Sequence, residues 1–265
     1  MRTLRRYARI WWRLAAMSFS ETWNTRINSL GWLLGKLVRL IFFFIFIVAI
    51  FKHTDSIHGY TLPEASLFFL TFNVVDLLAQ LLFRGIYGLR RIVTEGELDF
   101  YLVQPVNVLF RVACQTVDFL DCVVAVPVLA LTAWAIAQLP AGTVTPGNLT
   151  LYILLIANGT LIAFAMHVLV AALAVYSQQM ENAIWLYRDL MVLGRFPVDI
   201  YAKGMQMVLT FLVPIAVMTS FPTKALIGLL SARWIAYALL LSTVSIGVSL
   251  WLWLKALAHY SSVSS

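Results

Sequence analysis

Charged side chains are scarce in this sequence of 265 residues: Asp, Glu, Lys and Arg together make up 12%, about half the share that soluble domains carry. Hydrophobic residues make up 62%, and a chain so poor in polar side chains cannot cover a globular surface with them. The shortage excludes an ordinary water-soluble domain. We therefore expect the lipid bilayer to be the solvent of most of the chain.

Cysteine and histidine are also rare, with two and four residues. Cys114 and Cys122 lie in one apolar segment, and eight residues of helix separate them by about 12 Å, which is beyond the reach of a disulfide at about 5.5 Å. No C-x-x-C pair or histidine-rich cluster occurs. We therefore expect no disulfide between these cysteines and no metal site.

A nucleotide-binding phosphate loop is missing as well. Such a loop needs the pattern G-x-x-x-x-G-K-[ST], because glycine backbone and a lysine hold the phosphates. The one partial match is GTVTPGNL at Gly142–Leu149, which has Asn148 where the lysine should stand. We interpret this stretch as a turn and expect the chain to bind no cofactor of its own.

Long apolar runs are what the sequence does contain. Six of them can cross a bilayer, at about 20 residues each, and they lie near Leu30–Phe51, Pro63–Phe83, Val112–Leu139, Leu149–Tyr176, Met205–Ser220 and Trp234–Leu254. The predicted fold is therefore an all-α integral membrane protein with a single domain over residues 1–265. A six-span bundle at 30–254 follows an N-terminal segment at 1–28.

The 19 Lys and Arg residues predict the orientation, because cytoplasmic loops of membrane proteins are enriched in them. An even number of spans puts both termini on one side. If that side is cytoplasmic, only Lys52, Lys224 and Arg233 lie outside. The net charge of +7 then reflects topology, and we expect no nucleic acid among the partners.

The N-terminal segment is predicted to be an amphipathic helix, with arginines on one side and apolar residues opposite, at about 100° per residue. The arginines are Arg2, Arg5, Arg6, Arg9 and Arg13, and the apolar row is Leu4, Tyr7, Trp11 and Leu14. Such a helix is suited to lying on the inner membrane surface in contact with lipid. It serves either as a topology anchor or as a lever that also touches a cytoplasmic partner.

The stretch TEGELDFYLVQPVN, Thr94 to Asn107, is a polar loop between the second and third spans. Thr94 could cap a short helix with Glu95 and Glu97 in its first turn, where the helix end attracts negative charge. Pro105 would end that helix. Exposed acidic and aromatic residues across the mouth of two spans are typical of a docking element, although an ordinary amphipathic connector also fits these residues.

The same loop carries a resemblance. EGELDFYLVQPVN, Glu95 to Asn107, resembles the signature G-x-L-D-x-x-L-x-x-P of the ABC export permeases, the six-span transmembrane subunits of class-two ABC exporters that include drug and viologen exporters. GRFPVDIY at Gly194–Tyr201 and FLVPIAVMTSFP at Phe211–Pro222 are also similar. The three stretches occur in the expected order, so the resemblance covers nearly the whole chain. The short outer segment between the last two spans departs from the family pattern.

The resemblance implies several partners. A second permease chain, identical or related, would pair with this one in a bacterial cytoplasmic (inner) membrane, and two copies of a soluble ABC ATPase subunit, with ATP and Mg, would bind below. The loop after the second span would be the coupling helix, and the loop before the fifth span would be a second cytoplasmic element. The residues expected to contact the ATPase are Glu95, Gly96, Glu97, Leu98, Asp99, Leu102, Pro105, Gly194, Arg195, Phe196 and Pro197.

Charged residues also fall inside the predicted spans, where each costs about 2.5–3.5 kcal/mol on insertion. They form a band at similar depth: Lys36, Arg39, Asp76, Asp118 and Asp121, with His167 near the same layer. One interpretation is a salt-bridge layer that joins the first three spans. The other is a substrate or gating site for a cationic compound, with Asp76, Asp118, Asp121, Arg39 and His167 as candidates. On the second interpretation, Asp76→Asn lowers transport of a cationic substrate while the complex still assembles.

The function that these features favour is the permease subunit of an ATP-driven exporter, which carries a drug-like or cationic toxic compound by alternating access. Lipid-linked and peptide substrates fit nearly as well. ATP hydrolysis is expected on another chain, so this chain is not expected to be an enzyme. One alternative is an integral membrane enzyme, for which His53, Asp55 and His58 form the nearest cluster. The other is an ATP-independent channel or scaffold, which leaves the loop signature unexplained.

Overall fold

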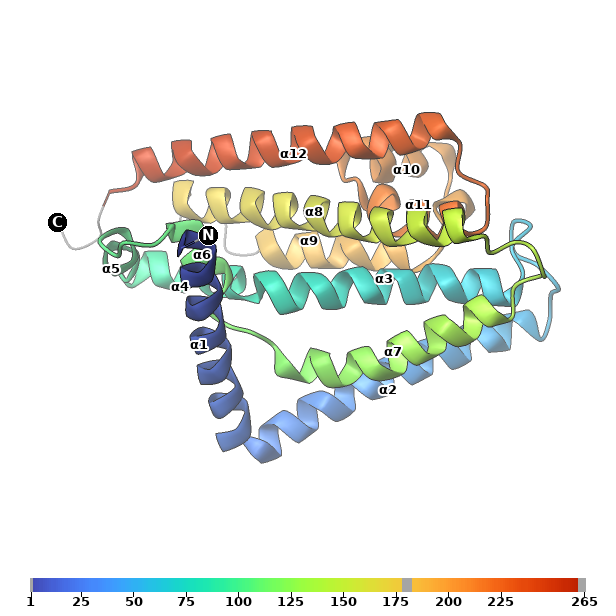
Figure 1. Ribbon diagram of the computed structural model, residues 1–265, viewed down its shortest axis with the longest axis horizontal. Helices are drawn as coiled ribbons and strands as arrows, with labels where there is room; N and C mark the ends of the chain where they lie inside the picture. The colour runs from blue at the N-terminus through green and yellow to red at the C-terminus, as the bar shows by residue number, and fades with distance from the viewer. Residues whose placement is uncertain (1, 178–182, 262–265) are drawn as a thin grey trace.

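The computed structural model describes residues 2–177 and 183–261 of the chain, which form a bundle of long helices (Figure 1). Within that part, five helices are long and apolar enough to cross a membrane. They are α2 (Arg26–Phe51), α3 (Leu62–Phe83) with its continuation to Thr94, α7 (Phe119–Ala137), α8 (Pro146–Tyr176) and α12 (Ala232–His259). The predicted all-α membrane fold is confirmed.

The two ends of the bundle differ. One end carries the short helices α4 (Leu89–Thr94), α5 (Leu98–Leu102) and α6 (Val108–Ala113), and we call it the α5 end. The opposite end carries α11 (Ile215–Leu226), and we call it the α11 end. The loop between α2 and α3 and the starts of α8 and α12 also lie at the α11 end (Figure 1).

Four predicted spans match helices to within about a turn and a half, whereas the third begins later than predicted. Val112 belongs to α6, which ends at Ala113, and α7 begins only at Phe119. Asp118 caps α7, because its Oδ1 accepts a hydrogen bond of 3.1 Å from the backbone N–H of Leu120. An Asp at this position satisfies a helix N–H that would otherwise lack a partner. Asp118 therefore stands at the mouth of the third span and not within it.

The fifth crossing is not made by the predicted segment Met205–Ser220. Because α8 ends at the α5 end and α12 begins at the α11 end, the chain crosses once between them (Figure 1). This crossing consists of α9 (Ala183–Met191) and the 3₁₀ helices η2 (Val192–Arg195) and η3 (Val198–Ile200). Its charged residues lower its hydropathy, so the sequence pattern favoured the more apolar segment that follows.

That following segment enters and leaves at the α11 end. Helix α10 (Lys203–Met207) with the π-helical η4 (Val208–Leu212) meets α11 at an angle of 99°. Both arms are held at Asp199: its carboxylate lies 2.8 Å from Lys224 Nζ, and its carbonyl accepts a hydrogen bond of 3.2 Å from the Gln206 side chain. Lys203, which was predicted on the cytoplasmic side, therefore lies at the α11 end.

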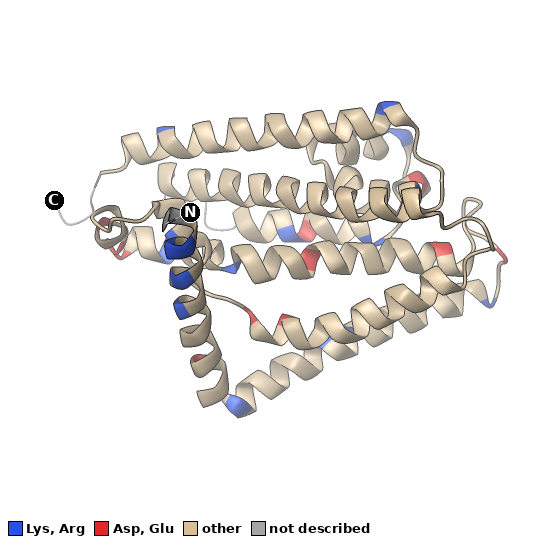
Figure 2. Cartoon of the chain, in the orientation of Figure 1, with Lys and Arg blue, Asp and Glu red and all other residues tan. Residues whose placement is uncertain are grey.

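The predicted N-terminal helix is present as α1 (Arg2–Asn24), and it runs across the long helices at the α5 end (Figure 1). The chain turns at Thr25 and continues as α2. On α1, Arg5 and Arg9 are exposed while Ala15 and Ser18 are buried against the bundle. Figure 2 shows that the cations of α1 form a row at this end of the molecule.

The close contact between α8 and α11 depends on Gly159. A Cβ atom at this position would lie 2.6 Å from the Met218 carbonyl oxygen and 3.0 Å from the Met218 Cα. These are backbone atoms, which cannot move aside without shifting α11. Leu155, Ile162 and Met218 are almost fully buried around the contact, so any shift of α11 also disturbs the packed core.

We predict that Gly159→Ala destabilises the protein by about 1–3 kcal/mol through overpacking, seen as a lower midpoint of thermal unfolding in detergent. Gly247→Ala is the matched control, because a Cβ there meets nothing within 4 Å and Ala is the better helix former by about 1 kcal/mol. Equal midpoints for the two variants would contradict the close contact of α8 with α11.

Candidate functional site

The loop between the second and third spans forms a tight turn between α4 and α5. Thr94 ends α4, and its hydroxyl donates a hydrogen bond of 3.1 Å to the Arg91 carbonyl. Gly96 takes a φ of +73°, the left-handed conformation that glycine adopts without strain. Helix α5 begins at Leu98 with Glu97 at its N-cap position. The prediction that Thr94 caps the short helix is therefore wrong, because the glycine turn intervenes.

Helix α5 presents apolar side chains to the outside of the molecule. Leu98 is fully buried and anchors the helix, whereas Phe100 is 69% exposed, Leu102 42% and Val103 81%. Apolar residues gathered on an exposed surface are typical of a protein interaction site. Leu102 was among the residues predicted to contact a partner, whereas Phe100 and Val103 were not. The exposure of these two residues depends on how α5 lies against the bundle, which the sequence alone does not give.

The acidic residues of the turn interact within the chain. Arg91 Nη1 lies 3.1 Å from Glu95 Oε2 and 3.9 Å from Glu97 Oε1, and these exposed pairs contribute little stability. Burial and the nearby Asp99 carboxylate raise the pKa of the Tyr260 hydroxyl, just after α12. Asp99 therefore faces the C-terminal segment, and the surface offered to a partner is mainly apolar.

Helix α1 holds the segment that follows α5. The Arg6 Nη2 donates a hydrogen bond of 2.6 Å to the carbonyl of Pro105, and the Tyr7 hydroxyl accepts one of 3.2 Å from the backbone N–H of Asn107. The rings of Tyr7 and Phe110 meet edge to face with centroids 4.7 Å apart. Helix α5 already ends at Leu102, so Pro105 serves as an attachment point for α1 and does not end the helix.

The segment Gly194–Pro197, which was predicted to be a second cytoplasmic element, lies elsewhere. The Phe196 ring lies 5.4 Å from the ring of Phe43 in α2, and Phe196 lines a small pocket together with Ile57 of the α2–α3 loop. A Cβ at Gly194 would lie 2.8 Å from Ile215 Cγ2 of α11. The segment thus belongs to the half of the fifth crossing nearer the α11 end, and it cannot share a docking surface with α5.

Lys36 joins the first span to the start of the third. Its Nζ lies 2.7 Å from Asp118 Oδ2 and 2.7 Å from Asp121 Oδ1. Arg84, just after the second span, lies 4.0 Å from Asp118. The first and third predicted spans are therefore joined by ion pairs, whereas the second contributes only Arg84, which follows its last residue.

Asp76 of α3 is paired with an arginine of α9. Arg188 Nη2 of α9 lies 3.8 Å from Asp76 Oδ2, and the Gln80 amide donates a hydrogen bond of 3.3 Å to Oδ1. Arg188 also donates a hydrogen bond of 3.0 Å to the Tyr87 hydroxyl. Because α9 was taken for a cytoplasmic loop, neither Arg188 nor this pairing could be predicted.

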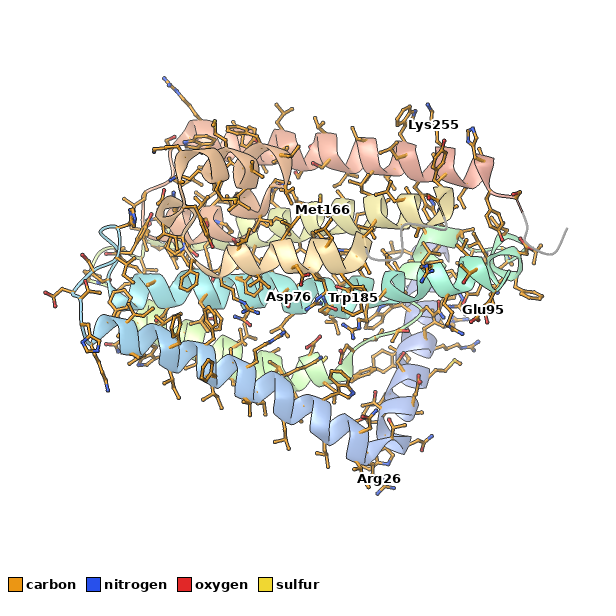
Figure 3. All side chains as sticks on the ribbon, turned by 180° about the vertical axis from the view of Figure 1, so that it is seen from behind. Arg26, Asp76, Glu95, Met166, Trp185 and Lys255 are labelled. Carbon is orange, nitrogen blue, oxygen red and sulfur yellow. The ribbon has the colours of Figure 1, made fainter. Side chains whose placement is uncertain are left out.

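These charges surround a cavity of about 570 Å³ between α2, α3, α8 and α9, a volume within the usual range of ligand sites. Figure 3 labels two of its residues, Asp76 and Trp185, near the middle of the bundle. The charged residues that line the cavity are Lys36, Arg39, Asp76, Arg84, Asp121, Arg188, Asp189 and Arg195. The aromatic residues are Trp32, Phe72, Tyr87, Trp185 and Tyr187.

His167 forms part of the cavity wall but is only 1% exposed. Its Nδ1 lies 2.7 Å from the Ala163 carbonyl of its own helix, and its ring packs against Phe83 and Tyr187. In the described part of the chain, Nε2 has no hydrogen-bond partner. Across those same residues, no group of three His, Cys, Asp or Glu could hold a metal ion.

We predict that Lys36→Met destabilises the protein by about 3–5 kcal/mol, because it leaves two mostly buried carboxylates without their cation. Lys36→Arg should keep most of the stability. Lys52→Met, at an exposed lysine just after α2, is the matched control. Thermal unfolding in detergent measures all three, and a Lys36→Met protein as stable as the control would show that the pairs contribute nothing.

Residues 37–264 match the family model described as ABC-2 family transporter protein. The matched range includes most of α2 and every later element, and therefore the α4–α5 turn and the cavity. No curated protein matches the chain.

Proposed function

We propose that this chain, which belongs to the ABC-2 family of transporter proteins and is a permease subunit of an ABC transporter, works as an exporter driven by an ATPase docked on the α4–α5 turn. The observation that carries the proposal is the exposed apolar surface of Phe100, Leu102 and Val103 on a helix anchored by buried Leu98. Such a surface, held at one end of a multi-pass membrane protein, suits a soluble partner.

The path from this surface to the cavity is short and continuous. Helix α3, the 3₁₀ helix η1 (Arg84–Gly88) and α4 follow one another without a break, and Asp76 and Gln80 of α3 line the cavity. A Cβ at Gly85 would clash with the Val112 carbonyl of α6, so α6 packs closely against η1 in this continuous helical segment. Movement of α5 can therefore shift the cavity wall, which is what alternating access requires.

The proposed orientation has the α5 end and both termini in the cytoplasm of a bacterial inner membrane. The arginines of α1 gather at the α5 end (Figure 2), as the positive-inside rule requires. Lys52, Lys203, Lys224 and Arg233 lie at the α11 end, and Lys224 is paired with Asp199. Two ATPase copies and a second permease chain, identical or related, would complete the transporter, with ATP and Mg on the ATPase.

We predict that Phe100→Asp with Val103→Asp abolishes co-purification of a soluble subunit that contains a phosphate loop, because two charges then replace the apolar contact. The matched control is Leu229→Asp, which changes an apolar residue that is 62% exposed in the loop before α12. The measurement is mass spectrometry of what co-purifies from the native host in mild detergent. Retention of the subunit by the double variant would contradict docking at α5.

A further inference from the structure

We propose that the cavity binds the anionic group of an amphiphilic substrate, between Arg39 of α2 and Arg195 of η2. The inference deepens the proposed function, since it names the chemistry of the transported compound. It also reverses the sequence-based expectation of a cationic substrate.

The charges that line the cavity do not balance. Five cationic side chains and three carboxylates line it. Lys36 is paired with Asp121, and Arg188 with Asp76. Asp189 is exposed to solvent. Asp118, just outside the lining, also lies 2.7 Å from Lys36. Five cations therefore stand against four carboxylates, so the carboxylates that were expected to receive a cationic substrate are outnumbered.

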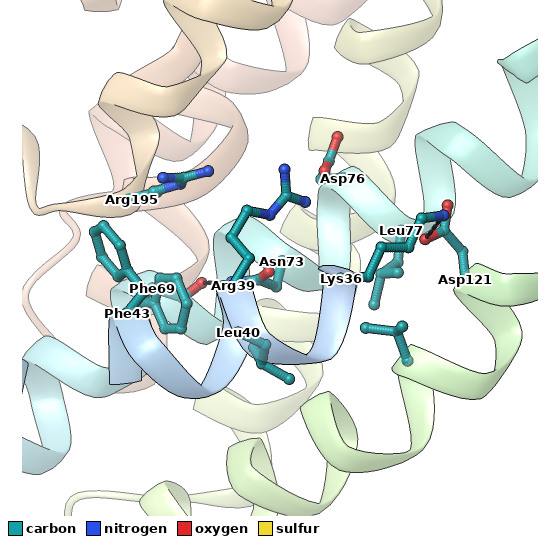
Figure 4. A pocket seen from close by; sticks show the side chains of 11 residues that line it. Lys36, Arg39, Leu40, Phe43, Phe69, Asn73, Asp76, Leu77, Asp121 and Arg195 are labelled. Carbon is teal, nitrogen blue, oxygen red and sulfur yellow. Dashed lines mark hydrogen bonds and ion pairs between the residues drawn. The ribbon is translucent and has the colours of Figure 1, made fainter. Parts of the chain in front are cut away.

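The surplus is concentrated at Arg39 and Arg195. Within residues 2–177 and 183–261, neither forms an ion pair within 4.0 Å of a carboxylate. Figure 4 shows both guanidinium groups directed into the same space, with Asp76 beside Arg39. Asp76 is already shared with Arg188, so one carboxylate faces three arginines.

The position of Arg195 is fixed by its surroundings. Its guanidinium carbon lies 5.0 Å from the ring centroid of Phe43 and 5.5 Å from that of Phe72, distances at which a cation is held over an aromatic face. Its Nε is buried without a hydrogen-bond partner among the described residues. An arginine held in this way keeps its planar fork of donors available for a carboxylate, phosphate or sulfonate.

The aromatic part of the cavity wall indicates the chemistry of the rest of the ligand. Trp32, Trp185 and Tyr187 line the same cavity and suit an apolar or aromatic body attached to the anionic group. Unpaired arginines at the depth of a bilayer are costly, and a bound anion satisfies both.

The test uses the full-length protein in nanodiscs of phosphatidylcholine, without an ATPase. The probes are pyrenebutyrate and pyrenemethylammonium, which share an aromatic body and carry opposite charges. Energy transfer from the tryptophans to pyrene reports binding, because Trp32 and Trp185 line the cavity. We expect saturable binding of pyrenebutyrate, weakened by added NaCl, and at least tenfold weaker binding of the cation.

The variants locate the site. Arg39→Gln and Arg195→Gln should each weaken pyrenebutyrate binding about tenfold or more, as expected for the loss of a charge-assisted hydrogen bond. Asp76→Asn should strengthen it a few-fold by removing the competing carboxylate. Arg233→Gln, at an exposed arginine at the start of α12, should leave it unchanged. If Arg195→Gln does not fold, Arg39→Gln carries the test, because Arg39 is an exposed residue whose replacement leaves the packed core unchanged.

Two results would overturn the proposal: equal affinity for the two probes, or wild-type affinity in Arg39→Gln. Adding phosphatidylglycerol to the nanodiscs identifies the source of the anion. If this lipid displaces the probe, the site binds a lipid headgroup. If the probe stays bound, the site binds a free amphiphile. Probe binding is measured without an ATPase, so its result does not depend on whether an ATPase docks at α5. Failure here likewise leaves the exporter assignment standing.

Discussion

A charge in the hydrocarbon part of a bilayer must meet an opposite charge, water or a bound ion, and this constraint determines the middle of the molecule. Lys36 satisfies it by bridging two carboxylates at the mouth of α7. Asp76 satisfies it through Arg188, which requires α9 to lie inside the bundle. The fifth crossing, the cavity and the surplus of arginine therefore all depend on one arrangement of charges.

The two ends of the bundle, on either side of these charges, differ in structure. At the α5 end, Leu98 anchors a short helix whose apolar side faces outward. At the α11 end, Asp199 holds both arms of the segment 203–226 and accepts a hydrogen bond of 2.8 Å from the Tyr60 hydroxyl. The cavity lies between these ends and is bounded by α3, which reaches both. The exposed apolar surface of α5 and the cavity are thus connected through one continuous helical segment, as the proposed coupling requires.

The sequence predicted much of the fold because long apolar helices are encoded locally. The apolar runs predicted α3 to within one residue and the end of α8 at Tyr176, whereas α8 begins at Pro146, inside the stretch interpreted as a turn. The polar loop at Thr94–Asn107 was also predicted between two spans, although Gly96 makes its turn at a different place, and its role as a docking element stays a prediction.

The fifth crossing could not be predicted in the same way, because Arg188, Asp189 and Arg195 make it resemble a loop. Its charges are tolerated because they face a cavity. The cavity forms only in the assembled bundle and cannot be seen in the sequence. The misplaced crossing also moved Gly194–Pro197 to the wrong end. For the same reason the pairing of Asp76 with Arg188 could not be predicted, and a cationic substrate was one of the two interpretations of these charges.

In the proposed mechanism, nucleotide binding by an ATPase docked at the α5 end changes access to the cavity. The most direct measurement labels Trp185→Cys with a membrane-impermeant maleimide in inside-out vesicles that contain the permease with its ATPase, after replacement of Cys114 and of the exposed Cys122. We predict labelling from the cytoplasmic side in the absence of nucleotide and loss of labelling when ATP is trapped with vanadate. Equal labelling in the two states would contradict the coupling of α5 to the cavity.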